Sequence, residues 1–541
     1  MKHKRTVVYQ IYPRSFKDSN NDGIGDLRGI IEKLDYLEYL GIDMIWLCPV
    51  YQSPNEDNGY DVSDYKDINP EFGTLDDMKE LLTKAKEKGI GIMMDIVANH
   101  TSDQHMWFKE ARTSRENPYH SFYVFKDANH GIPSDLQSIF LDSAWAYNEQ
   151  TDEYYLHMFA KGQPDLNWHH EPVRESIYDI LNYWIDLGVE GFRFDVIDLI
   201  AKELDQNIIG DGPKLHQYIR EMSDRVFKGR NLLTVGETWG ATVEKAKKYS
   251  NLDGSEFSMI FNFEHILLDQ VENKEKWDLK PLSIIDLKQV FKRQQQGLYN
   301  VGWNSLFWNN HDLPRIVSRW GNDKEYRVES AKAFATLLHF MQGTPYIYQG
   351  EELGMTNTVI NSTDDLRDIE SFNMIKQRTA LGYNYDEIMK SIRAKGRDNA
   401  RTPMQWNNKQ YAGFSKAEPW IGINPNYKEI NVENQLGKDN SVLEYYRKLI
   451  KLRKNSKYSD IIEKATFDLM YEEHPSLFAY KRVYEGKEII VLCNLSNREI
   501  LIKNDIQFDE VIIHNYDDLE LMTGMVLRPY EAIGLFATGQ K

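Results

Sequence analysis

Four short segments of the chain place acidic side chains where a β-strand is expected to end. They read MMDIVANH (93–100), GFRFDVID (191–198), LLTVGETW (232–239) and FWNNHDLPR (307–315), and in each an apolar, β-prone run leads into a polar cluster. Acids gathered at the ends of parallel strands usually line a cleft for chemistry. Acids that converge with an Arg and two His suit glycoside cleavage, which needs a nucleophilic carboxylate and a protonated carboxylic acid.

Asp195 is the candidate nucleophile. It follows Arg193 by two residues, so the alternation of a strand points both side chains to the same face. A neighbouring Arg lowers the pKa of a carboxylate, and we therefore expect Asp195 to be ionised, as a nucleophile must be. An ordinary Arg–Asp ion pair is the alternative interpretation.

Glu237 is the candidate general acid and base. It ends an apolar run and precedes Trp239. An aromatic wall removes water from a carboxyl group, which disfavours its charged form and lets it hold a proton near neutrality. A loop or helix-capping glutamate is the alternative.

Composition restricts the class of protein. The 541 residues predict two or three domains, and the 41% hydrophobic and 12% aromatic contents are those of a globular chain. The net charge of -18 argues against nucleic acid and anionic membranes as partners and fits a neutral substrate. Cys48 and Cys493 lie outside any metal-ligand spacing and are expected to be free thiols.

No targeting or membrane segment is predicted. The N-terminal stretch MKHKRTVVYQIYPRSF is basic and lacks the apolar run of a signal peptide. No segment approaches the roughly 18 apolar residues of a membrane helix. We expect a monomer in the cytoplasm that acts on imported sugars.

The order of apolar runs predicts an α/β fold, a (β/α)8 TIM barrel with two additions. Helix-like stretches, such as 27–40, 75–88, 173–187 and 330–341, separate the predicted strands. The strands are expected at 7–12, 44–47, 90–96, 191–196, 232–236, 259–263, 305–309 and 345–349.

Three segments depart from this alternation. Residues 101–172 are rich in aromatics, Asp and His without steady periodicity, which is typical of a functional loop or small inserted domain. A second insertion, about 351–420, is partly helical at 365–379 and 385–395. We therefore place the barrel in 1–100 and 173–464, the inserted domain in 101–172, and a C-terminal antiparallel β domain in 465–541, where short alternating runs occur.

Five motifs occur in a fixed order along the chain: QPDLNW (163–168), GFRFDVID (191–198), TVGETWGAT (234–242), NNHDLPR (309–315) and GRDNARTPMQW (396–406). With these motifs the chain resembles the α-amylase superfamily, glycoside hydrolase family thirteen, over most of its length. Within it, the bacterial oligo-1,6-glucosidases and dextran glucosidases are most similar. The resemblance implies a lid-like B domain at 101–172 and an exo-acting, retaining α-glucosidase that cleaves α-1,6 bonds of isomalto-oligosaccharides.

The resemblance also implies roles for the motif residues. Asp195 would be the nucleophile, Glu237 the acid and base, and Asp312 a stabiliser of the transition state. His100 and His311 would bond sugar hydroxyls. Retention of configuration requires the nucleophile and the acid to lie about 5 Å apart.

Further residues are implied to hold the terminal glucose. Tyr60 would stack on it, while Asp61 paired with Arg397 would bind its outer hydroxyls and close the pocket beyond it. A plain ion pair is the alternative for those two residues. Phe140 is a further candidate for this subsite.

Three residues match positions that set specificity in the similar enzymes. Val196 follows the nucleophile, where valine accompanies α-1,6 cleavage and alanine or glycine accompanies α-1,4 cleavage. Trp239 and Lys276 match residues that shape the subsite beyond the cleaved bond.

A polar loop at 18–26 spaces oxygen donors around a glycine turn, as an EF-hand does, but lacks the glutamate at the twelfth position. A polar βα turn is the alternative. The resemblance implies a structural Ca²⁺ there. Its ligands would be Asp18, Asn20, Asp22, the carbonyl of Ile24, and Asp26.

Three other functions remain open. Trehalose-6-phosphate hydrolase and sucrose isomerase share the chemistry. A catalytically inactive relative, such as a transporter heavy chain, differs in class, but such chains lose catalytic acids that are present here as Asp195, Glu237 and Asp312.

Overall fold

The computed structural model describes residues 2–140, 142–502, 506–518 and 525–538. Its largest sheet has eight strands in the order β11-β10-β9-β5-β2-β1-β13-β12, with neighbours parallel. A parallel bridge between Ile260 and Asn304 joins the two ends of this order, so the sheet closes into a barrel. The strands are β1 (Val8–Ile11), β2 (Met44–Leu47), β5 (Gly91–Val97), β9 (Gly191–Asp195), β10 (Leu233–Thr238), β11 (Met259–Asn262), β12 (Ser305–Leu306) and β13 (Thr344–Tyr348).

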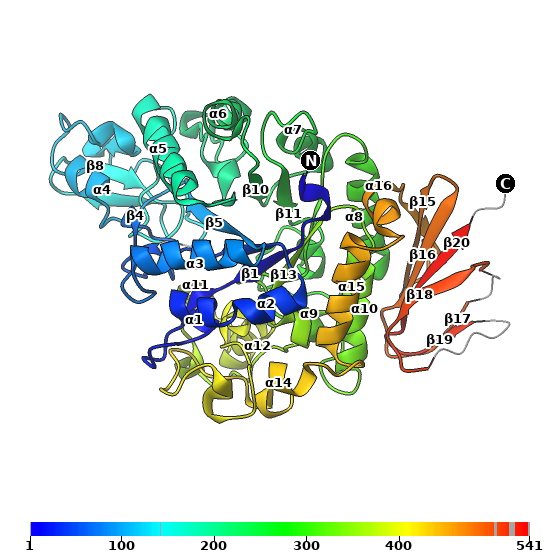
Figure 1. The fold of residues 1–541 in the computed structure, drawn as a ribbon. Coiled ribbons are helices and arrows are strands. Elements are labelled where there is room, and N and C mark those ends of the chain that lie inside the picture. The colour runs from blue at the N-terminus through cyan, green and yellow to red at the C-terminus, as the bar shows by residue number, and fades with distance from the viewer. Residues whose placement is uncertain (1, 141, 503–505, 519–524, 539–541) are drawn as a thin grey trace.

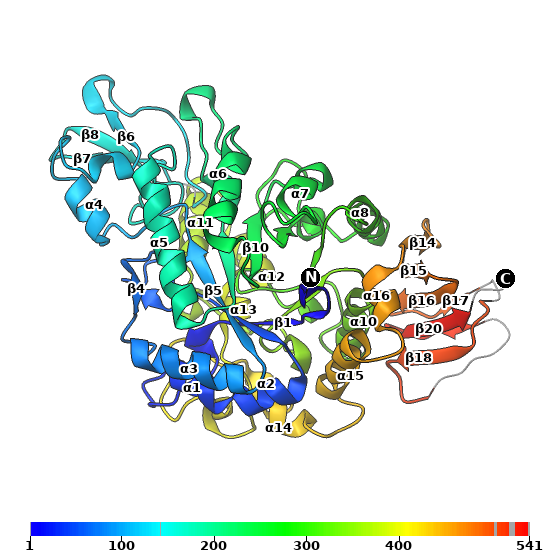
Figure 2. The same cartoon turned by 45° about the horizontal axis from the view of Figure 1, so that its top comes forward.

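The predicted barrel strands are confirmed, with ends that shift by a few residues. Every residue of β2, β5 and β9 is buried, because helices cover the outer face of a parallel barrel and side chains fill its interior. Helices surround the strands on the outside (Figures 1 and 2). They include α3 (Leu75–Glu87), α5 (Glu171–Leu187), α6 (Leu215–Met222), α8 (Ile284–Gly297) and α10 (Arg327–His339).

The helix predicted at 27–40 is interrupted. Residues 27–40 form two helices, α1 (Leu27–Glu32) and α2 (Leu34–Leu40). Lys33 between them has φ -106° and ψ 4°, which is outside the helical region. Its ammonium group lies 4.4 Å from the ring centroid of Trp406, so a long-range contact accompanies the break.

The insertion after β5 carries its own small sheet. Strands β6 (Phe125–Asp127), β8 (Glu153–Leu156) and β7 (Trp145–Asn148) pair antiparallel in that order. The segment projects at one end of the barrel, next to α5 (Figures 1 and 2). A backbone hydrogen bond of 2.9 Å from Leu166 to Asn99 fastens it to the end of β5.

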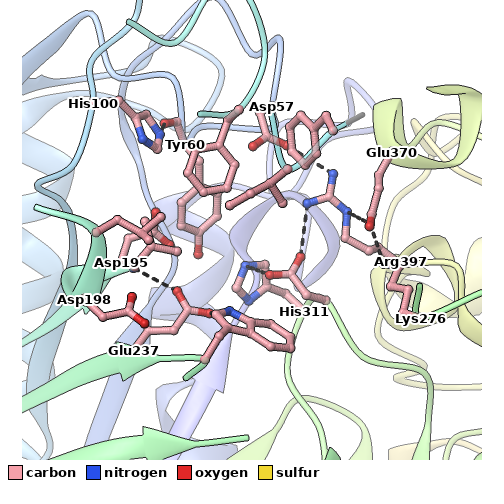
Figure 3. A pocket seen from close by; sticks show the side chains of 17 residues that line it. Asp57, Tyr60, His100, Asp195, Asp198, Glu237, Lys276, His311, Glu370 and Arg397 are labelled. Atoms are coloured by element: carbon pink, nitrogen blue, oxygen red, sulfur yellow. Dashed lines mark hydrogen bonds and ion pairs between the residues drawn. The ribbon is translucent and has the colours of Figure 1, made fainter. Parts of the chain in front are cut away.

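The insertion after β13 contains helices α11 (Ile369–Ala380) and α12 (Tyr385–Lys395). The first begins four residues later than predicted from 365, because Asp368 caps it by accepting from the backbone of Glu370. Its first turn brings Glu370 to the mouth of the barrel (Figure 3).

The C-terminal part is the predicted antiparallel sheet, in the order β14-β15-β16-β20-β18. It packs against α10 on the side of the barrel away from the first insertion (Figure 1). Within the residues described, no helix is long and apolar enough to cross a membrane. The strands are β14 (Asp468–Met470), β15 (Leu477–Tyr484), β16 (Lys487–Asn494), β18 (Glu510–His514) and β20 (Ala532–Thr538).

Candidate active site

A cavity of about 380 Å³ opens where the carboxyl ends of the barrel strands meet the two insertions. Figure 3 shows Asp195 and Glu237 on one side of it and Arg397 on the opposite side. The predicted residues that line the cavity are Tyr60, His100, Phe140, Asp195, Val196, Glu237, Trp239, Lys276, His311, Asp312 and Arg397.

Arg193 lies beneath the floor of the cavity and connects the two candidate catalytic acids. Its Nη1 is 2.7 Å from Asp195 Oδ1, and its Nη2 is 2.6 Å from Glu237 Oε2. The same Nη1 is 2.9 Å from Asp95 Oδ1, so three carboxylates share one guanidinium. The side chain of Arg193 is 1% exposed, which makes this the central ion-pair network of the site.

Arg193 alone predicts an ionised Asp195, but burial and neighbouring acids act in the opposite direction. Burial raises the pKa of Asp195 well above its usual value, Arg193 opposes this, and the charges of Glu237 and Asp95 add to the rise. Burial likewise raises the pKa of Asp95 to about 6. Burial and the neighbouring acids therefore oppose the ionised form of Asp195, and the buried Arg193 is the group that favours it.

Glu237 is held by donors on both of its oxygens. The backbone N–H of Val196 donates to Oε2 over 3.0 Å, and the indole N–H of Trp239 donates to Oε1 over 3.2 Å. The Trp239 ring stacks on Phe263 with centroids 4.0 Å apart, which fixes the indole beside the acid. Trp239 is therefore both the predicted aromatic wall and a hydrogen-bond donor.

Asp312 is paired with cations from the GRDNARTP motif. Arg401 Nη2 is 2.8 Å from its Oδ1, and Arg397 Nη1 is 3.4 Å from the same oxygen. Burial raises the pKa of Asp312, but His311, Arg397 and Arg401 lower it by more, so the net pKa is below its usual range. Asp312 is thus a permanent negative charge at the pocket wall.

The two predicted histidines are neutral. Burial lowers the pKa of His100 to about 4 and that of His311 to about 3. Gln10 Nε2 lies 2.9 Å from His311 Nδ1, which leaves Nε2 of His311 facing Asp312 at 3.2 Å. Tyr60 stacks on His311 with ring centroids 5.1 Å apart, so the predicted glucose-stacking ring is itself held in place.

The predicted pair of Asp61 with Arg397 is wrong. Asp61 is fully buried outside the cavity, and its carboxylate accepts backbone N–H groups of Glu56 (2.8 Å) and Asp57 (3.1 Å). The acid that faces Arg397 is Asp57, at 3.2 Å, and it lines the cavity. Asp61 therefore stabilises the loop, and Asp57, four residues earlier, is the acid that contacts the pocket.

Lys276 and Phe140 complete the wall. Lys276 Nζ is 2.5 Å from Glu370 Oε2, and Glu370 also lies 3.4 Å from Arg397. The guanidinium carbon of Arg397 is 5.5 Å from the centroid of the Phe140 ring. The polar side chains that the sequence did not identify are Asp57, Asp198, Glu370 and Arg401, and the apolar ones are Ile139, Phe159 and Leu199.

The sequence contains partial signals for three of these missed residues. Asp198 ends the GFRFDVID motif that supplied Asp195. Asp57 lies in the same NEDNGYD segment as Tyr60, and Arg401 lies in the motif that supplied Arg397. No local pattern distinguishes Glu370, because a contact between insertions brings it to the pocket.

The loop at 18–26 satisfies much of its own hydrogen bonding. Asp18 accepts from the backbone of Asn21 and Gly23 and from Ser415. Asp26 accepts from Gly29 as the N-cap of α1. The oxygens of Asn20 and Asp22 accept backbone N–H groups from Asp22 and Ile24 respectively. No group of three or more His, Cys, Asp or Glu arranged for a metal occurs among the described residues, and the Ca²⁺ site stays a prediction.

Comparison with known proteins places these features in a family. A family model described as the catalytic domain of alpha amylase matches residues 10–462. An oligo-1,6-glucosidase of Bacillus cereus is 50% identical over 98% of each chain. A glucan 1,6-alpha-glucosidase of Streptococcus pneumoniae is 51% identical over 97% of each. The solved trehalose-6-phosphate hydrolase of Bacillus licheniformis has a TM-score of 0.93 at 43% identity, over 98% of this chain and 99% of that chain.

Proposed function

The chain belongs to the alpha-amylase family of glycoside hydrolases, and from this premise we propose that it is a retaining exo-α-glucosidase that cleaves α-1,6 bonds. Its substrates would be short isomalto-oligosaccharides and dextran fragments, cut at the non-reducing end. The observation that carries the proposal is the pair of carboxylates, Asp195 and Glu237, joined by Arg193 on the pocket floor.

In the first step Asp195 attacks the anomeric carbon of the terminal glucose while Glu237 donates a proton to the glycosidic oxygen. The bond to the leaving sugar breaks, and a glucosyl ester of Asp195 forms. The shared guanidinium keeps the two acids close, as the spacing of about 5–5.5 Å in retaining enzymes requires. Asp312 offers a fixed negative charge toward the sugar, where positive charge develops in the transition state.

In the second step Glu237, now ionised, takes a proton from water. The water oxygen attacks the anomeric carbon, the ester bond breaks, and Asp195 is regenerated as a carboxylate. Two inversions restore the original α configuration. Arg193 stabilises whichever of its carboxylates carries charge at each stage.

The ion pairs of Arg397 support exo action. Arg397 forms ion pairs with Asp57 at 3.2 Å and with Asp368 at 2.6 Å. Together these side chains would close the pocket beyond one terminal sugar. Preference for α-1,6 bonds is supported by Val196 beside the nucleophile and by relatives named for that linkage.

The direct test is hydrolysis of methyl α-isomaltoside followed by proton NMR, because its leaving sugar is a methyl glucoside and free glucose comes only from the non-reducing end. We expect α-glucose to appear first and to mutarotate later. Initial release of β-glucose would contradict the double displacement. Absence of hydrolysis of isomaltose and isomaltotriose would contradict the proposed substrate class.

Trehalose 6-phosphate is the second candidate substrate, because a solved hydrolase of that substrate is 43% identical. A phosphate group needs a cation that is available to bind it. Among the described residues that line the pocket, the Lys and Arg side chains are those of Lys276 and Arg397. Both are already paired, Lys276 with Glu370 and Arg397 with Asp57, and this favours a neutral substrate. Sucrose isomerisation is tested in the same assay by following isomaltulose.

The remaining sequence-based expectations are also proposals. Carboxylate, amide and carbonyl oxygens at 18–26 are the ligand types that Ca²⁺ prefers, which supports a structural ion there. Two buried free thiols, Cys48 and Cys493, suit a reducing compartment such as the cytoplasm. Sedimentation of the purified chain would test the proposed monomer.

A further inference from the structure

A second cavity of about 470 Å³ adjoins the catalytic pocket. It lies between the first insertion and α11. The two cavities share Phe140 and Phe159, whose rings pack edge to face with centroids 5.6 Å apart. These rings therefore form a wall with the catalytic pocket on one side and the second cavity on the other.

Three polar side chains in the second cavity have unused hydrogen-bonding capacity. Ser138 is 4% exposed, yet its hydroxyl has no hydrogen-bond partner among the described residues. The Nδ1 of His157 donates to the carbonyl of Phe159 over 3.1 Å, and burial lowers the pKa of this histidine, so its Nε2 is an acceptor. Asn373 donates its amide N–H to the carbonyl of Phe140 over 3.3 Å, which leaves its side-chain oxygen available.

The charges of the cavity disfavour an anionic ligand. Glu56 and Asp142 contribute two carboxylates against one cation, Lys161. Phosphate binding would instead require an excess of Lys or Arg. Trp145 and Tyr147 add aromatic surface. Hydroxyl-binding groups beside aromatic rings are suited to a neutral ring that carries several hydroxyls.

We propose that this cavity is a second, non-catalytic binding site for a free monosaccharide. Glucose is the expected occupant because the adjoining pocket releases it, and that identity rests on the proposed function. Phe140 would then contact a sugar on each side, with its carbonyl already held by Asn373. The site lies outside the reach of the catalytic acids and makes or breaks no bond.

The test is calorimetric titration of the full chain with D-glucose while an iminosugar saturates the catalytic pocket. We expect one glucose to bind per chain under these conditions. Ser143→Trp adds a large ring to the exposed edge of the cavity and should weaken this binding at least tenfold, with isomaltose hydrolysis retained. Glu149→Trp is the matched control, because residue 149 is exposed and lines neither cavity.

A crystal of the same complex should contain a sugar beyond Phe140, within hydrogen-bond distance of Ser138 and His157. No glucose binding when the catalytic pocket is filled would overturn the proposal, as would equal binding to wild type and to Ser143→Trp. Failure of the proposed function would appear separately, as lack of isomaltose hydrolysis by wild type, and leaves the titration interpretable.

Discussion

The backbone N–H of Val196 lies 3.0 Å from Oε2 of Glu237, so the residue that follows the nucleophile also holds the acid. Val196 has φ 36° and ψ 46°, a left-handed conformation that costs a β-branched residue about 1–3 kcal/mol. This turn directs Asp195 and Glu237 toward each other at the ends of β9 and β10. The strained turn at Val196 thus links the two catalytic acids structurally.

Replacement of either catalytic acid should abolish turnover while the fold survives. We expect Asp195→Asn and Glu237→Gln to lower kcat for isomaltose by about 10³-fold or more, since each removes a group that bonds to, or protonates, the reacting atoms. Steady-state kinetics and thermal unfolding of the same preparations measure both properties.

Asp76→Asn, on the exposed first turn of α3, is the matched control and should retain wild-type kinetics. Near wild-type hydrolysis by either catalytic variant would refute the assignment of that acid.

Asp57 and Asp61 of the NEDNGYD segment should respond differently to alanine. Asp57→Ala removes the pocket-facing partner of Arg397 and should raise KM for isomaltose about tenfold or more, because the sugar loses a fixed hydroxyl-binding pair. Asp61→Ala leaves two backbone N–H groups without an acceptor and should lower the unfolding free energy by about 1–3 kcal/mol.

Kinetics and denaturant unfolding of both variants separate these effects. A larger rise of KM in Asp61→Ala than in Asp57→Ala, at equal stability, would restore the pairing that the sequence suggested.

The sequence predicts those parts of the site that local pattern determines. Asp195 and Glu237 follow apolar strand runs, so their place at the barrel mouth follows from the alternation of strands and helices. The partner of Arg397 could not be predicted, because Asp57 and Asp61 lie in one loop and only the folded loop decides which carboxylate turns inward. The protonation of Asp195 likewise depends on acids from other strands.

The pH dependence of stability should contain a contribution from Asp198. Burial first, then Asp211 and Glu237, raise its pKa to about 7 from 3.8. Below 3.8 the group is protonated in both folded and unfolded chains and has no effect on stability. Between 3.8 and about 7 only the unfolded chain ionises, so this group destabilises the fold progressively as pH rises, by at most about 4 kcal/mol.

Asp198→Asn cannot ionise and should therefore raise the unfolding free energy at pH 8 more than at pH 4. Urea unfolding at the two pH values is the measurement. An equal change at both pH values would show that the carboxyl does not titrate in this window.

The loop at 18–26 should respond to Ca²⁺ if it binds the ion. Binding to the folded state alone must stabilise it by mass action, so a chelator should lower the Tm of wild type. Asp18→Ala should lower Tm and bound calcium together, with kcat unchanged where the chain remains folded. Loss of the hydrogen bonds that Asp18 accepts from Asn21 and Gly23 would also lower Tm, even with no calcium present. Elemental analysis of bound calcium distinguishes that effect from the loss of the ion.

The last prediction concerns linkage preference and uses the turn at Val196. Its side chain lines the pocket beside Asp195, where a small steric change alters transition-state fit by about 1–3 kcal/mol, or roughly 10–200-fold in selectivity. We expect wild type to favour isomaltose over maltose, and Val196→Ala to shift the ratio of the kcat/KM values toward maltose. Val196→Gly should shift this ratio in the same direction. Because glycine adopts the left-handed conformation without strain, the Tm of the glycine variant should not fall. Preference of wild type for maltose would overturn the linkage proposal, and an unchanged ratio in both variants would assign the preference to other residues of the pocket.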